Sequence, residues 1–233
     1  MTKKFTIKEA FFDGFDKMKK YWFIVLGAGA LTVAVSMLFE IVNNVLTGGK
    51  YSEPSILAVL LSLVVSLASA AFSILTSYNM MKMLFKMHDG TAAKVMDVFH
   101  YNKKDLKKIG YWFLASLLYG AVVFLGLICL IIPGIYLAIR YGFALYLMID
   151  KDMGIKESFH ESAKMTKGQI WHIIGFGIAS FFAIVLGLLL LVVGLIPAYI
   201  IVMFANIYVY RKLAIHHATH HTDHHHTDSD LNA

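Results

Sequence analysis

The residue best placed to carry chemistry is an arginine inside a long apolar stretch. Arg140 interrupts a run that is otherwise free of Asp, Glu, Lys and Arg from Ile109 to Ile149. A charge at such a position is costly in a membrane, and it usually faces the interior of a helical bundle, where it finds a partner. Glu40 stands at a comparable depth in an earlier apolar stretch. The positions predict a Glu40–Arg140 pair, and the alternative is that both side chains extend separately to the outer interface.

A second group of chemistry-bearing residues stands near the end of the chain. Imidazole is a ligand for zinc, copper and nickel, and histidine-rich tracts bind such metals. The residues around these histidines are polar, so we expect residues 214–233 to form a disordered cytoplasmic tail. We expect zinc or nickel binding there to be weak and adventitious. The seven histidines are His216, His217, His220, His221, His224, His225 and His226.

The chain carries no recognisable catalytic motif. No P-loop, HExxH pattern or nucleophile motif is present in the sequence. The segments between apolar stretches are too short to form a soluble catalytic domain. We therefore expect the protein not to be an enzyme and to use no cofactor.

Long apolar stretches are the elements that must position these residues. The chain is 58% hydrophobic and 15% charged, whereas soluble domains carry about 25% charged residues. A helix needs about 20 apolar residues to cross a bilayer, and proline with glycine favours a break within a longer run. Pro133-Gly134 and Gly194–Pro197 provide such breaks. The sequence predicts an all-α, polytopic membrane bundle in one domain, residues 1–213, with spans near 21–42, 55–81, 110–132, 134–149, 170–193 and 196–211.

The basic residues are concentrated on one side of this predicted bundle. Nineteen of the 21 lysines and arginines lie before the first span, after the last, or in the segments that follow the second and fourth spans. Lys50 alone lies on the opposite side, and Arg140 lies within a span. Cytoplasmic segments carry the Lys/Arg excess. The pattern predicts an inner-membrane, multi-pass protein with both termini in the cytoplasm.

Three of the predicted cytoplasmic segments resemble one another. Ile7–Phe11, Val95–Phe99 and Ile155–Phe159 share a spacing of apolar and acidic residues, and each precedes a tryptophan that opens a span. The pattern predicts three repeats of an amphipathic helix followed by a helical hairpin. The aromatic faces of these helices fit either the membrane interface or the ends of the bundle. The residues expected at the interface are Phe11, Phe15, Trp22, Phe99, Trp112, Phe159 and Trp171.

The second half of the chain carries a moderately specific motif. Ile132-Pro133-Gly134-Ile135 is followed by Arg140-Tyr141 and Asp150, and the pattern continues to Trp171 through Glu157, Ser162 and Lys167-Gly168. Over roughly residues 110–213 the chain resembles bacterial six-helix membrane proteins of unknown function. These are similar to the membrane domain that precedes some glycerophosphodiester phosphodiesterases. The resemblance implies architecture and no catalytic residue, since the phosphodiesterase domain itself is absent from the sequence.

Two functions fit these features. The first is a non-enzymatic protein that supports membrane, envelope or lipid organisation through cytoplasmic interfacial helices. Its expected partners are anionic membrane lipids rather than nucleic acid. The alternative is a transporter of a small solute or ion, with Arg140 and Glu40 lining the path.

Overall fold

The computed structural model describes residues 5–47, 55–101, 105–190 and 194–230, with side chains as far as His217. Helix accounts for 88% of the structure, and no strand occurs in these residues. Six helical segments are long and apolar enough to cross a membrane. The fold is therefore an all-helical, multi-pass membrane architecture, as the sequence predicts.

The six segments follow the predicted order of spans. They are α1 (Ile7–Leu46), α2 (Ile56–His88), α3 (Asp105–Cys129), α4 (Ile131–Tyr141) with α5 (Ala144–Asp150), α7 (Ile170–Leu189) and α8 (Leu195–Asp230). Two short helices stand between spans: the 3₁₀ helix η2 (Val95–Phe99) and α6 (Ile155–Met165). Within the single membrane domain that the sequence predicts, contacts form two compact units. One comprises Met1–Trp22 with Gly110–Ala233, and the other comprises Phe23–Ile109.

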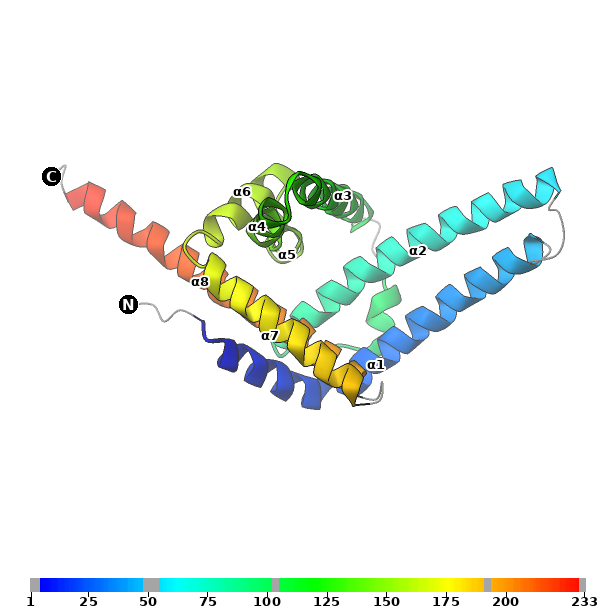
Figure 1. Cartoon of the computed structure of the whole chain (residues 1–233), viewed down its shortest axis with the longest axis horizontal. Helices are drawn as coiled ribbons and strands as arrows, with labels where there is room; N and C mark the ends of the chain where they lie inside the picture. Colours follow the sequence, from blue (N-terminus) through cyan, green and yellow to red (C-terminus); the bar gives the residue numbers. More distant parts are fainter. Residues whose placement is uncertain (1–4, 48–54, 102–104, 191–193, 231–233) are drawn as a thin grey trace. The chain divides into compact units, whose positions relative to one another are not determined.

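In the first unit, α8 is the most deeply buried span. Of its most apolar window, 56% is buried, and Phe204 and Tyr210 are fully enclosed. α7 packs along α8 (Figure 1). The beginning of α1 also packs here, because the Tyr21 ring lies 6.3 Å from that of Phe204. Gly14 permits this approach, since a Cβ at that position would lie 2.5 Å from the Ile201 carbonyl oxygen.

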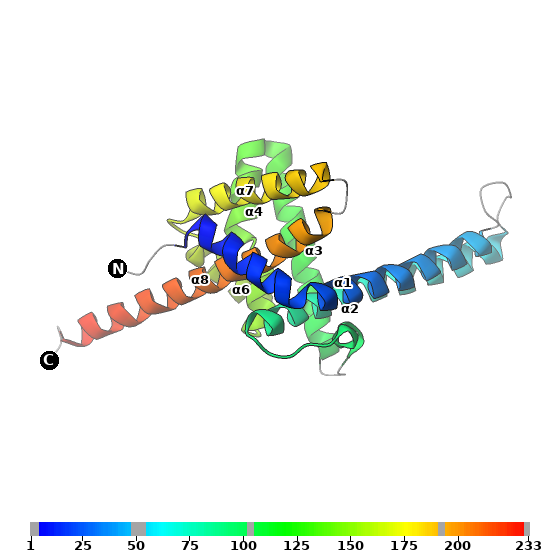
Figure 2. The same ribbon diagram turned by 90° about the horizontal axis from the view of Figure 1, so that it is seen from below.

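The α3–α4 hairpin of the same unit (Figure 2) begins its second helix earlier than the sequence predicts. Leu130 is the extended residue before α4, so the break precedes Pro133 by three residues. Pro133 then occupies the first turn of α4, where a missing N–H costs nothing because no intrahelical acceptor exists for it. Pro197 occupies the same position in α8. Both prolines therefore begin a helix, and neither forms the break itself.

The second unit is built from the rest of α1, from α2 and from η2. Phe39 of α1 lies 5.7 Å from Phe72 of α2, and Phe72 stacks on Phe99 of η2 at 5.9 Å. The most apolar window of α2 has no buried residue. Such an extended apolar surface, with Leu57 66% exposed, fits contact with lipid rather than with water.

The helix α8 extends into the segment 214–233, whose expected disorder stays a prediction. α8 continues without interruption to Asp230. Once a helix is nucleated by packing, each further residue adds a hydrogen bond at small cost. No glycine or proline stands in 214–230 to end the helix. The side chains of His220, His221, His224, His225 and His226 lie outside the described residues.

Candidate functional site

The three repeated segments share a buried position, although their secondary structures differ. The first segment is the start of the continuous helix α1, the second is the short 3₁₀ helix η2, and the third is the separate helix α6. Ala10, Val98 and Ser158 occupy the same place in the repeat, and each is fully buried. The three segments therefore dock through equivalent faces.

The next repeat position is aromatic, and each of its side chains packs on an aromatic ring of a span. Phe11 lies 5.8 Å from Phe176 of α7, and Phe159 lies 5.5 Å from Tyr141 of α4. Phe99 stacks on Phe72 of α2, as described above. These three rings therefore pack against their own units, and their expected place at the membrane interface stays a prediction. Trp171 (82%), Trp22 (48%) and Phe15 (40%) remain exposed, while Trp112 is half-buried.

α6 is held against the end of α4 by side-chain hydrogen bonds. The Ser162 hydroxyl donates to the Arg140 carbonyl oxygen at 2.9 Å, and the Thr166 hydroxyl approaches the same oxygen at 3.4 Å. The last carbonyls of a helix lack intrahelical donors, so α6 supplies hydrogen-bond donors to the end of α4. Ser162 and Thr166 are fully buried. The backbone at Arg140 is therefore fixed against α6.

A groove of about 630 Å³ lies between α4 and α6. Its lining combines aromatic and charged side chains, and basic groups outnumber acidic ones. Lys156 and His160 are exposed, and neither side chain makes a hydrogen bond or ion pair with another described residue. The same holds for Glu157, the single carboxylate of the groove. The lining residues are Arg140, Tyr141, Lys156, Glu157, Phe159, His160 and Ala163.

The Arg140 guanidinium is only partly satisfied within the chain. Its Nη1 donates to the Tyr136 hydroxyl, and the guanidinium carbon lies 5.7 Å from the Tyr136 ring centre. Its Nε is buried and makes no hydrogen bond to any described group. Glu40 is exposed on α1 in the other unit, so the Glu40–Arg140 pair stays a prediction. The sequence predicts Arg140 as a site residue, and the structure shows that α6 lies next to it.

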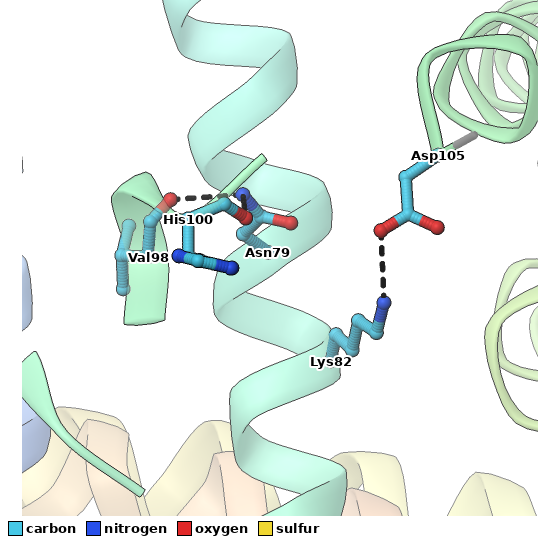
Figure 3. A network of polar contacts seen from close by, with 5 residues as sticks. All are labelled: Asn79, Lys82, Val98, His100 and Asp105. Carbon is cyan, nitrogen blue, oxygen red and sulfur yellow. Dashed lines mark hydrogen bonds and ion pairs between the residues drawn. The ribbon is translucent and has the colours of Figure 1, made fainter. Parts of the chain in front are cut away.

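A second polar cavity, of about 80 Å³, lies in the other unit. The Asn79 amide donates to the carbonyl oxygens of Val98 at 3.0 Å and His100 at 3.4 Å, while Lys82 pairs with Asp105 at 3.2 Å. Figure 3 shows Asn79 turned toward the segment of Val98 and His100, and Lys82 turned toward α3. These contacts fix η2 and the start of α3. Because they occupy the Asn79, Lys82 and Asp105 side chains with contacts inside the chain, the site is better explained as structural.

A third cluster joins α5 to α8. Arg211 Nη1 lies 2.8 Å from both carboxylate oxygens of Asp150, and the Tyr210 hydroxyl donates to Asp150 at 2.7 Å. The Asp150 side chain is 13% exposed. Asn79 and this cluster were not predicted as sites from the sequence. The available signal was a single amide in the apolar run of α2 and an acid at the end of the fourth span.

The histidine-rich segment contacts the rest of the unit at its first turn. His217 Nδ1 lies 3.0 Å from a carboxylate oxygen of Glu161 on α6. Among the described residues no three His, Cys, Asp or Glu side chains converge in a way that could hold a metal ion. This leaves the proposed metal binding of His216 and His217, together with the histidines beyond them, as a prediction.

Comparison with known proteins assigns the chain to no family. No protein-family model matches the chain, and it has no significant match among curated proteins or solved structures. The membrane architecture, the docked segments and the groove are therefore the features that bear on function.

Proposed function

We propose that the chain is a non-enzymatic protein of the cell inner membrane that supports lipid and envelope organisation by holding anionic lipids at its cytoplasmic face. The resemblance to bacterial six-helix membrane proteins is part of this proposal, and it contributes an architecture without an activity.

The placement of the segments supports the proposal most strongly. Buried side chains at Ala10, Val98 and Ser158 fix three segments to their units. Lys8, Lys94 and Lys156, on or next to the same segments, are exposed. Because the segments are already fixed to their units, their lysines can contact an anion with little further loss of conformational freedom. Anionic headgroups of the cytoplasmic leaflet attract such residues by about 1 kcal/mol for each lysine or arginine near the surface.

Orientation follows from the charge distribution. Both termini and the segments after the second and fourth spans are cytoplasmic in this proposal, because they carry nineteen of the 21 basic residues. The exposed tryptophans Trp22 and Trp171 then lie near the cytoplasmic ends of their spans. Indole rings are favoured at the headgroup level.

Lipid enrichment around the protein tests the proposal. The full chain is reconstituted in phosphatidylcholine nanodiscs that contain a minor fraction of phosphatidylglycerol, and the lipids that copurify after brief detergent extraction are quantified by mass spectrometry. We expect phosphatidylglycerol to be enriched over its bulk fraction. The triple variant Lys8→Gln, Lys94→Gln and Lys156→Gln should lower the enrichment, while Lys50→Gln, on the opposite side, should not. Wild-type protein without enrichment would contradict the proposal.

The transporter alternative is supported by a different observation, the buried Nε of Arg140 inside a span. It requires solute flux through proteoliposomes of the same composition. Arg140→Ala with Glu40→Gln should abolish such flux without lowering expression. In a lipid-organising protein the same pair of changes should lower bundle stability instead.

A further inference from the structure

We propose that the groove between α4 and α6 is a binding site for the phosphate group of an anionic membrane lipid, with Arg140 as its central donor. The inference rests on the proposed function and makes it specific, since it assigns one saturable site within a generally basic surface.

Arg140 has donor capacity that the described residues do not use. A guanidinium carries five N–H donors arranged for bidentate contact with phosphate or carboxylate oxygens. One nitrogen bonds to Tyr136, and the buried Nε has no described acceptor. No described carboxylate lies within ion-pair distance of Arg140. A buried charge-bearing group without an acceptor is costly, and a bound phosphate oxygen would remove that cost.

The groove carries an excess of basic side chains. Arg140, Lys156 and His160 are basic, against the single acidic residue Glu157. None of the three α6 side chains is engaged by another described residue. The excess of positive charge favours an anion and disfavours a metal ion or an amine. The absence of internal ion pairs leaves Lys156 free to reach a ligand.

Contacts between α4 and α6 hold the groove in place. The Arg140 carbonyl is bonded to buried Ser162, and Phe159 packs on Tyr141 beside it. The two walls of the groove are thus held together before any ligand binds. A preorganised site spends less of its binding free energy on ordering side chains.

The surroundings of the groove favour a lipid over a soluble phosphate. Phe159 and Ala163 form an apolar part of the lining. α4 exposes Ile135 and Tyr136 one turn before Arg140, in a segment apolar enough to cross the membrane. A phosphate held at Arg140 would therefore lie next to lipid-facing surface. Acyl chains attached to that phosphate could remain in the bilayer.

Native mass spectrometry of the full chain in detergent tests the site, with dioctanoyl phosphatidylglycerol as the probe. We expect saturable binding of one lipid. Arg140→Gln with Lys156→Gln should weaken it about tenfold or more, because both substitutions remove a charged donor to the phosphate oxygens. Lys19→Gln with Lys20→Gln removes the same charge from the same face and should leave this saturable binding within about twofold.

Further variants keep the test decisive if Arg140→Gln fails to fold. Lys156→Glu with His160→Glu changes only exposed side chains and should also abolish the saturable binding, whereas Glu157→Gln should strengthen it. Equal losses in the groove and control variants would overturn the site. Displacement of the lipid by an equal concentration of inorganic phosphate would show a soluble-anion site and would overturn the lipid assignment. Nanodisc enrichment that persists in the Arg140→Gln and Lys156→Gln variant, together with unchanged saturable binding, would remove the groove and keep the proposed function.

Discussion

At the residue scale, Arg140 has two separate structural roles. Its side chain lines the groove, while its carbonyl oxygen accepts the hydrogen bond that docks α6. The second role depends on the end of α4 at Tyr141, because an unbroken helix would use that carbonyl internally. The position of the charge and the position of α6 are therefore linked through one residue.

Removal of the Ser162 hydroxyl should loosen this link. Ser162→Ala deletes the donor to the Arg140 carbonyl in a fully buried place. The expected cost is about 1 kcal/mol or somewhat more, since the carbonyl keeps only the longer contact to Thr166. The measurement is the thermal unfolding midpoint in detergent. Ser116→Ala provides the control, because the Ser116 hydroxyl bonds only within its own helix, to Phe113. Equal midpoints for the two variants would contradict the role assigned to Ser162.

Single residues could be predicted from the sequence only where their own surroundings along the chain are unusual. Arg140 stands out as a charge in an apolar run. Its contact with Ser162 does not, because twenty-two positions separate the two residues. The same limit applies to Asp150 and Arg211, which are sixty-one positions apart. Such pairs depend on how helices pack, and helical spacing alone does not determine packing.

At the scale of elements, close contacts between glycines define the two tight hairpins. A Cβ on Gly126 of α3 would lie 2.9 Å from the Cα of Gly134 in α4. A Cβ on Gly187 of α7 would lie 2.7 Å from the Gly194 carbonyl oxygen at the start of α8. Small residues at helix interfaces let backbones approach closely in membranes. Each hairpin therefore depends on a pair of positions that tolerate no side chain.

Alanine at two glycines of α3 should have opposite effects. Gly126→Ala would force α3 and α4 apart and should destabilise the hairpin by about 1–3 kcal/mol, the usual cost of overpacking. Gly120→Ala meets no atom within 4 Å. It should be neutral or stabilising by up to about 1 kcal/mol, because alanine is the better helix former. Thermal unfolding in detergent measures both. A Gly126→Ala protein as stable as Gly120→Ala would show that the contact is not needed.

The existence and order of the spans were predictable, but several of their ends were not. Hydropathy and length determine where a helix can cross a membrane, so all six spans appear in the predicted order. The break before α4 was placed at Pro133 rather than at Leu130, because proline is acceptable in a first helical turn as well as after a helix end. The second repeat forms only the short helix η2. The Val98 carbonyl within it and the His100 carbonyl after it accept hydrogen bonds from the Asn79 amide. That interaction is tertiary, and the repeat pattern does not contain it.

At the scale of the whole chain, the exposed apolar surface and the distribution of basic residues both indicate a membrane protein. Large exposed side chains such as Leu57, Ile132 and Leu189 stand on helices that are apolar enough to span. These surfaces need lipid around them, since exposure to water would cost about 25 cal/mol for each square ångström. Basic residues are sparse within these helices and frequent at one set of their ends.

This one-sided charge makes the orientation testable by cysteine labelling. Cys129 is exposed, so it is first replaced by serine, and single cysteines are then introduced at Lys20, Lys50, Lys103 and Lys164. With a membrane-impermeant maleimide on intact cells, only the cysteine at position 50 should react, because the other three belong to segments that carry the basic excess. Permeabilised cells should label all four and thereby control for accessibility. Labelling at position 103 in intact cells would reverse the orientation and would place the basic segments, and with them the groove, on the outer face.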